Sequence, residues 1–285
     1  MPTNLSFAGV IVLYNPEKDV INNIVSYLNC LDHLYIIDNS LTDNKAIKEL
    51  LISNGNKVSY IPFKENRGIA KALNVGCTIA SQKGYKWLLT MDQDSRISSE
   101  DFFKIAEDSI LANAKIGIVS ASYFRSDITK ETTYSSPCII TSGNVVNLLA
   151  WKKVGGYNEK LFIDEVDNEF CVLLRMRGFE VRQTRDNFLN HKLGNDFLVY
   201  DTIKSKNKTL IRHPPIRLYY MTRNGLYIIF TYFIKDTKVA VSRLRNLVIL
   251  YYQIIRFYEH KGDYLKYIFK GFRDFTLSRY GKYKT

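Results

Sequence analysis

Short apolar runs alternate with amphipathic stretches along the first 120 residues of the chain. The runs are rich in β-branched and aromatic residues and are too short for typical helices, so they predict buried strands. These expected strands cover residues 7–15, 33–40, 57–63, 86–92 and 116–120. The stretches with helical spacing cover residues 17–29, 43–53, 67–81 and 99–113. This alternation predicts an α/β fold in which helices flank both faces of a mostly parallel central sheet.

Three of the expected strands end in informative residues: Asn15-Pro16, Asp38-Asn39-Ser40 and Asp92-Gln93-Asp94. Ligands of open parallel sheets bind beyond the carboxyl ends of the strands, so we expect these residues to face one crevice. No glycine-rich phosphate loop is present, and a nucleotide would need another partner for its phosphates. Mg²⁺ or Mn²⁺ held by Asp92 and Asp94 would supply one. The alternatives are a solvated turn for this pair and a turn or helix cap for Asp38.

A second acidic cluster begins an expected helix that runs to Gly178, and a histidine follows it along the chain. Acids are favoured in the first turn of a helix, which explains some of the cluster. One of them could instead be a general base, and the histidine could be a structural residue or a metal ligand. The residues are Asp164, Glu165, Asp167, Glu169 and His191.

The positive charge of the chain is concentrated near its end. The net charge is +12, yet residues 202–285 contain 18 Lys and Arg against 4 Asp and Glu, together with 17 of the 36 Phe and Tyr. Amphipathic helices are expected at 213–234 and 241–260. We therefore divide the chain into an α/β domain, residues 1–210, which carries the candidate site residues above, and a helical basic and aromatic extension, residues 211–285. Such charge fits nucleic acid, an anionic membrane surface or anionic substrates.

The remaining composition points to a cytosolic protein. No apolar run approaches the roughly 18 to 20 residues of a membrane span, and the apolar N-terminal segment is interpreted as a strand, not as a signal peptide. The four cysteines have neither metal nor redox spacing, so we expect reduced thiols.

Seven segments, in this order, resemble family 2 glycosyltransferases, and most closely their bacterial rhamnosyltransferase branch, which builds O-antigen and other surface polysaccharides. The resemblance covers roughly residues 7–224. The segments are "GVIVLYNP", "IIDNS", "NRGIAKALNVG", "LLTMDQDS", "FIDEVDNEFCVLLRMRGF", "NHKLG" and "HPPIRLYYMTRN".

This resemblance implies a GT-A fold, a nucleotide-sugar donor, a divalent metal ion and inversion at the anomeric carbon. It implies that Asp94 binds Mg²⁺ or Mn²⁺ on the donor diphosphate, with Asp92 near the ribose and metal shell and His191 helping to hold the metal or the diphosphate. Asp38 would contact the nucleobase. The other implied donor-side residues are Asn15, Asn66, Arg67, Gly68 and Gln93.

The resemblance also implies that Asp167 is the catalytic base. The sequence "VDNE" stands here where many members have "EDVD". Asp164 and Glu169 therefore stay open as alternatives.

In the extension, the branch signature "R-x-YY-x-x-RN" matches Arg217, Tyr219, Tyr220, Arg223 and Asn224. The resemblance implies that they line the acceptor site or clamp the donor diphosphate. The extension itself could pack on the catalytic domain, form a homodimer contact or meet the inner membrane surface, where lipid-diphosphate-linked saccharide acceptors lie.

The expected function is transfer of L-rhamnose from dTDP-rhamnose to a hydroxyl of such an acceptor, by a cytoplasmic protein peripherally associated with the inner face of the plasma membrane. The same chemistry with UDP-galactofuranose, UDP-glucose, UDP-galactose or UDP-N-acetylglucosamine is the alternative. A non-catalytic basic protein that binds a membrane or nucleic acid is the remote alternative. Nucleic acid is not the expected partner, because the chain has no zinc spacing, RNA-binding aromatic motif or helix-turn-helix signature.

Overall fold

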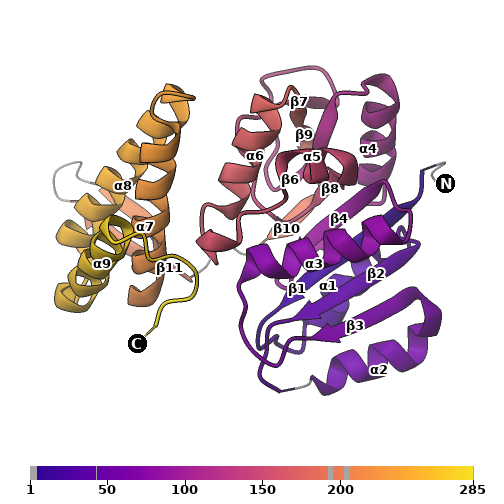
Figure 1. The fold of residues 1–285 in the computed structure, drawn as a ribbon, viewed down its shortest axis with the longest axis horizontal. Coiled ribbons are helices and arrows are strands. Elements are labelled where there is room, and N and C mark those ends of the chain that lie inside the picture. Colours follow the sequence, from indigo (N-terminus) through magenta and orange to yellow (C-terminus); the bar gives the residue numbers. More distant parts are fainter. Residues whose placement is uncertain (1–4, 43, 192–194, 202–205, 285) are drawn as a thin grey trace. The chain divides into compact units, whose positions relative to one another are not determined.

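The computed structural model describes residues 5–42, 44–191, 195–201 and 206–284, and its contacts divide the chain into two units (Figure 1). The N-terminal unit consists of Met1–Phe162 and Val166–Lys192, and the C-terminal unit of Ile163–Glu165 and Leu193–Thr285. The division expected after residue 210 falls inside a strand of a hairpin. Because the two strands of this hairpin bond to each other, both belong to the C-terminal unit.

The N-terminal unit is built on an eight-stranded sheet, counted over the described residues. In spatial order its strands are β3 (Val58–Pro62), β2 (His33–Asp38), β1 (Phe7–Leu13), β4 (Trp87–Asp92), β8 (Asn144–Asn147), β6 (Ile116–Ser122), β9 (Glu180–Asn187) and β7 (Thr133–Ser135). The first four are parallel, whereas β8 runs antiparallel between β4 and β6. The mostly parallel sheet is confirmed, and β8 is an insertion that the apolar pattern did not reveal.

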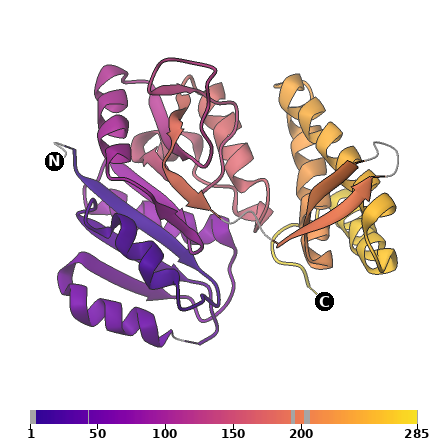
Figure 2. The same cartoon turned by 180° about the vertical axis from the view of Figure 1, so that it is seen from behind.

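Helices cover both faces of this sheet, as opposite views of the molecule show (Figures 1 and 2). They are α1 (Val20–Leu28), α2 (Lys45–Asn54), α3 (Ile69–Gln82), α4 (Asp101–Ala112), α5 (Leu148–Val154) and α6 (Val166–Met176), with single turns η1 (Gly55–Lys57) and η2 (Glu159–Leu161). Ile11 of β1 belongs to the core cluster shared with Ile24 of α1 and Phe102 of α4, whereas Gly76 of α3 lies against Val10. Strand β1 is thus buried on both faces, which explains its continuous apolar run.

In the part of the C-terminal unit that the structure describes, three helices join the hairpin. These elements are α7 (Pro215–Tyr232), α8 (Thr237–Phe257), α9 (Lys261–Thr276), β11 (Asn195–Asp201) and β12 (Lys206–Arg212). Its core includes Leu218 of α7, Ile254 of α8 and Ile268 of α9. The two predicted helices are confirmed as α7 and α8, and α9 is an addition. Among the described residues, no helix combines the length and apolar character needed to cross a membrane.

Candidate active site

The register of the parallel strands brings the polar strand ends to one edge of the sheet. Leu13 at the end of β1 is paired with Asp38 of β2, and its neighbour Val12 is paired with Asp92 of β4. The side chains after these strands therefore start from adjacent positions. Asn15, just after β1, donates its backbone N–H to Ser40 Oγ at 2.7 Å, which links the ends of β1 and β2.

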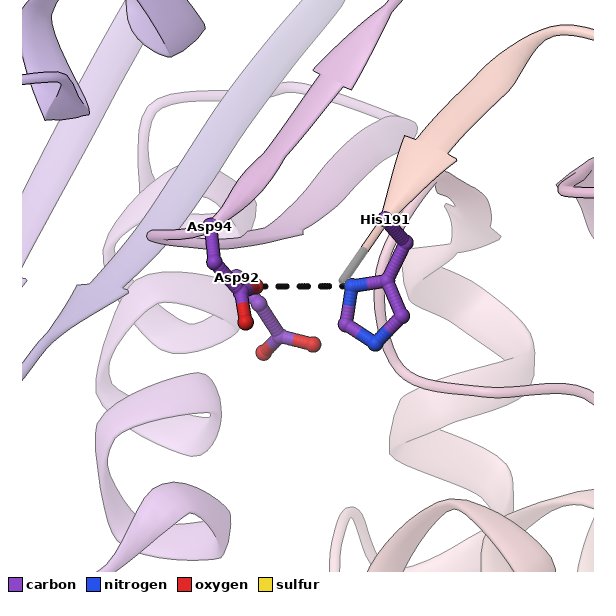
Figure 3. A group of neighbouring side chains, drawn as sticks. All are labelled: Asp92, Asp94 and His191. Atoms are coloured by element: carbon purple, nitrogen blue, oxygen red, sulfur yellow. Dashed lines mark ion pairs between the residues drawn. The ribbon is translucent and has the colours of Figure 1, made fainter. Parts of the chain in front are cut away.

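A two-stranded ribbon brings a distant histidine to the same edge. Strand β5 (Ser95–Ile97) follows the acidic run directly, and it pairs antiparallel with β10 (Leu189–His191), so that Ser95 lies opposite His191. His191 Nδ1 is 2.7 Å from Ser95 Oγ and 3.4 Å from Asp94 Oδ1. Figure 3 shows the side chains of Asp92, Asp94 and His191 close together, with Asp94 directly before β5 and His191 at the end of β10.

The surroundings of Asp94 favour its charged form. Burial alone would raise the pKa of its carboxyl group. The hydrogen bond and charge of His191, with hydrogen bonds from the Asp94 backbone and Ser95, outweigh this effect, and the pKa lies below its ordinary value. At neutral pH Asp94 is therefore an anion beside an oriented imidazole, as a metal ligand needs to be.

The donor atoms of this cluster fit a divalent cation. Asp92, Asp94 and His191 each offer one ligand atom, and these atoms lie within 4.8 Å of one another. Two carboxylates and an imidazole form a set compatible with Mn²⁺ and with Mg²⁺. The hydroxyl of Tyr27 on α1 is buried and has no hydrogen-bond partner within the described residues. Burial, and then the charge of Asp92, raise its pKa, so the hydroxyl stays protonated and neutral.

The loop before α3 forms a second part of the candidate site. Asn39 Oδ1 accepts the backbone N–H of Arg67 at 3.0 Å, and Asn66 Oδ1 accepts that of Gly68 at 3.0 Å. Gly68 has φ 85°, and a Cβ there would lie 2.6 Å from the carbonyl oxygen of Phe162. Only glycine fits this position without displacing backbone. The predicted residues Asn66, Arg67 and Gly68 thus share one rigid turn.

Asp38 and Gln93 are fixed by contacts inside the protein. Asp38 is buried, and its two carboxylate oxygens accept hydrogen bonds from the Tyr60 hydroxyl and the Ser40 backbone, each at 2.8 Å. Gln93 Oε1 accepts the backbone N–H of Tyr14 at 2.8 Å. The contact between Asp38 and a nucleobase stays a prediction. Both carboxylate oxygens already accept hydrogen bonds from the protein.

Two of the predicted acids lie in the first turn of α6. Asp167 is half-buried and accepts the backbone N–H of Asn168 at 2.8 Å. Glu169 is buried and accepts a hydrogen bond from Asn158 Nδ2 at 2.7 Å. Asp167 is therefore the more accessible of the two carboxylates.

The acids just before α6 belong to the C-terminal unit. Asp164 and Glu165 both have positive φ, and their carboxylates are paired with Arg217 of α7 at 3.0 Å and Arg243 of α8 at 3.2 Å. Asn224 Nδ2 donates to the carbonyl oxygens of Ile163, at 2.7 Å, and Asp164, at 3.1 Å. These contacts hold a strained backbone turn directly before the acidic helix.

Arg223 and Tyr220, both predicted to contact ligand, are enclosed within the C-terminal unit. Arg223 is 0% exposed, and its guanidinium lies 5.1, 5.2 and 5.6 Å from the ring centroids of Tyr219, Tyr220 and Tyr280. It donates to the carbonyl oxygen of Gly281 at 2.8 Å. These contacts explain why the signature combines arginine with tyrosines, and they leave no surface of Arg223 for a diphosphate in this structure. We therefore leave both residues out of the proposed donor site.

Sequence reasoning placed Asn39 at the crevice without giving it a role, and it did not single out Ser95 or Tyr27. Each is a common residue type, and its importance depends on what lies beside it. Asn39 and Ser95 directly adjoin predicted acids, which was the available signal. No comparable signal was available for Tyr27, because an aromatic residue at helical spacing looks like an ordinary core residue.

Comparison with known proteins places this geometry in a family. The profile of Glycosyl transferase family 2 matches residues 10–177. The dTDP-rhamnosyl transferase RfbF of Shigella flexneri is 32% identical over 248 residues, which cover 79% of this chain and 80% of the relative. This relative comes from the branch that the sequence resembles.

Solved structures share the fold at low sequence identity. S. aureus TarS 1–349 in complex with UDP-GlcNAc has a TM-score of 0.61 at 12% identity, covering 94% of this chain and 81% of TarS. The mannosyltransferase PcManGT from Pyrobaculum calidifontis, in complex with GDP-Man and Mn²⁺, has a TM-score of 0.57 at 12% identity, covering 98% and 91%. The expected GT-A fold is confirmed. Because the profile spans more than half of the chain, the protein belongs to glycosyltransferase family 2.

Proposed function

We propose that this protein transfers L-rhamnose from dTDP-rhamnose to a hydroxyl of a saccharide acceptor, with a divalent metal ion and with inversion at the anomeric carbon. The observation that carries the proposal is the cluster of Asp92, Asp94 and His191 in a chain that is 32% identical to a dTDP-rhamnosyl transferase. The rigid turn at Asn66–Gly68 supports a nucleoside pocket beside it.

In the proposed reaction, Asp94, Asp92 and His191 would hold the divalent metal ion. When bound, either Mg²⁺ or Mn²⁺ would offset the negative charge of the departing group. The contacts of Ser95 and Asp94 with His191 Nδ1 orient the imidazole before the metal arrives, so less ordering is needed on binding.

Asp167 is the proposed general base. It accepts the proton of the acceptor hydroxyl while the hydroxyl oxygen forms a bond to the anomeric carbon. The bond from that carbon to the diphosphate breaks on the opposite face, and dTDP leaves with the bonding electrons. Asp164 is a weaker candidate, because its carboxylate is already paired with the Arg217 guanidinium at 3.0 Å.

The proposed acceptor is a lipid-diphosphate-linked saccharide of a bacterial surface polysaccharide such as O-antigen. The protein would work in the cytoplasm, peripherally associated with the inner face of the plasma membrane. The excess of 18 basic over 4 acidic residues in 202–285 supports an anionic membrane partner.

A donor panel tests the proposed function. The full chain is incubated with dTDP-rhamnose, UDP-glucose, UDP-galactose, UDP-galactofuranose or UDP-N-acetylglucosamine, with Mg²⁺, with Mn²⁺ or with a chelator. Thermal stabilisation and slow nucleotide release are followed. Asp94→Ala tests the metal cluster, and Asp127→Ala, at a highly exposed acid outside it, is the matched control.

We expect metal-dependent stabilisation by dTDP-rhamnose that is lost in Asp94→Ala and kept in Asp127→Ala. Preference for a UDP-sugar would reject the rhamnosyl assignment while keeping the metal cluster. Equal binding with metal and with chelator would reject the metal role.

A further inference from the structure

The outer side of α8 carries an apolar stripe that the core of the C-terminal unit does not use. On the inner side, Leu247 lies against Gly225 of α7, and the Tyr251 hydroxyl donates to Thr222 Oγ1 of α7 at 3.0 Å. On the outer side are five large residues, each between 48% and 59% exposed. They are Val241, Leu244, Val248, Tyr252 and Ile255.

The spacing of these five residues places them on one face. They follow one another at intervals of three, four, four and three residues, which is the period of a single helix face. The exposed residues Lys238, Arg245 and Arg256 recur after seven and eleven residues, close to two and three helical turns. Cations therefore line one margin of the apolar stripe.

The exposed apolar surface continues onto α9. Leu265, Phe269 and Phe272 of α9 are exposed and spaced by four and three residues. The ring of Phe272 lies 6.3 Å from that of Tyr251 of α8, so the two helices adjoin at this point. The exposed Lys266 and Arg273 flank the α9 residues. The stripe is thus part of a broader apolar and basic surface.

Charge decides which partner suits the stripe. Helix α8 contains four basic residues and no acid, so two copies of it would bring like charges together along the seam. An anionic bilayer surface instead offers apolar contact to the stripe and negative head groups to the cations at its margin. Long basic side chains reach such head groups while their methylene stems remain in apolar contact.

We infer that the outer face of α8, extended by α9, docks on an anionic lipid bilayer with the helix lying in the interface. This inference deepens the membrane association proposed above and rests on it, but it does not depend on the identity of the donor. It assigns the apolar stripe to insertion between head groups and Lys238, Arg245 and Arg256 to contact with lipid phosphates.

Flotation of the full chain with lipid vesicles tests this surface. The vesicles are phosphatidylcholine alone or an equal mixture of phosphatidylcholine and phosphatidylglycerol. One variant combines Leu244→Gln, Val248→Gln and Ile255→Gln, and a second combines Arg245→Gln with Arg256→Gln. Leu111→Gln with Val25→Gln, at exposed apolar sites of α4 and α1, is the matched control. Circular dichroism and donor binding are measured on the same samples.

We expect the unmodified chain to bind the anionic vesicles and to bind phosphatidylcholine at least about tenfold less. The stripe variant should lose at least about tenfold in binding to anionic vesicles. The arginine variant should lose the preference for anionic lipid, and the control should bind as the unmodified chain does. Retained donor binding in the stripe variant would separate this surface from the glycosyl transfer site.

Equal vesicle binding by a folded stripe variant would overturn the inference. So would absence of binding by the unmodified chain. A dimer in sedimentation that the stripe substitutions abolish, without vesicle binding, would assign the face to self-association instead.

Discussion

The acids in and before α6 differ in what surrounds each carboxylate. Asp164 faces the guanidinium of Arg217, and Glu169 is buried against the side-chain amide of Asn158. Asp167 is half-buried, with its carboxylate at the first turn of the helix. The family resemblance favoured Asp167 but left Asp164 and Glu169 open, because each acid stands within a few residues of the others. The partners of Asp164 and Glu169 support the same order.

We predict that Asp167→Asn lowers kcat by about 10²- to 10⁴-fold, because the amide cannot accept the proton of the acceptor hydroxyl. Donor binding should be retained, since Asp167 is not part of the metal cluster. Steady-state kinetics and thermal stabilisation by donor measure the two effects separately. Glu169→Gln, which preserves side-chain shape, should keep most of the activity. A larger loss of kcat in Glu169→Gln or Asp164→Asn than in Asp167→Asn would move the base to that residue.

The helices of the C-terminal unit depend on close approach between α7 and α9. A Cβ at Gly271 of α9 would lie 2.7 Å from the backbone oxygen of Tyr219 and 2.9 Å from Cβ of Thr222, both in α7. The hydroxyl of Tyr219 also donates to Asp274 of α9 at 2.9 Å. Glycine therefore allows two helices to pack at a distance that any side chain would prevent.

We predict that Gly271→Ala lowers the free energy of unfolding by about 1–3 kcal/mol, because α7 and α9 must separate to admit the methyl group. Gly262→Ala is the matched control in the same helix, since a Cβ there meets nothing within 4 Å. It should leave stability unchanged or raise it by up to about 1 kcal/mol through helix propensity. Urea unfolding measures both. Equal stability of the two variants would contradict the close packing.

The charges of the whole chain make its folding stability depend on pH. His213 contributes a loss of stability as the pH falls. Burial first, and then the charge of Arg217, lower the pKa of His213, while Asp164 opposes them. The folded state therefore disfavours the protonated imidazole. Well above about pH 6.5 the imidazole of His213 is neutral in both the folded and the unfolded state, so its contribution to folding stability is fully present. As the pH falls below that value, the unfolded chain takes up the proton first and stability is lost.

We predict that the melting temperature falls between about pH 7.5 and 5.5 and that His213→Asn removes part of this fall. His260→Asn, at an exposed histidine that begins α9, is the control and should leave the fall unchanged. Differential scanning calorimetry in buffers of equal ionic strength measures the effect. An identical pH dependence in all three proteins would contradict the assignment to His213.

Features that depend on local pattern were predictable from the amino-acid sequence. Apolar runs buried on both faces, such as β1, and the periodic helix α3 predicted an α/β sheet. Asp92 and Asp94 were predictable because they end a strand, and strand ends meet at one edge of a parallel sheet. The family followed from motifs in a fixed order.

Features that depend on contacts between distant residues came from the folded structure. Ser95 and His191 are 96 residues apart, and a short antiparallel ribbon, which has no periodic signal of its own, brings the imidazole to Asp94. Likewise, the apolar residues of α8 are of similar types on both sides of the helix, and packing against α7 decides which of them are buried. The physical reason is the same in both cases: a side chain's chemistry is set by its neighbours in space, and local sequence specifies only its neighbours along the chain.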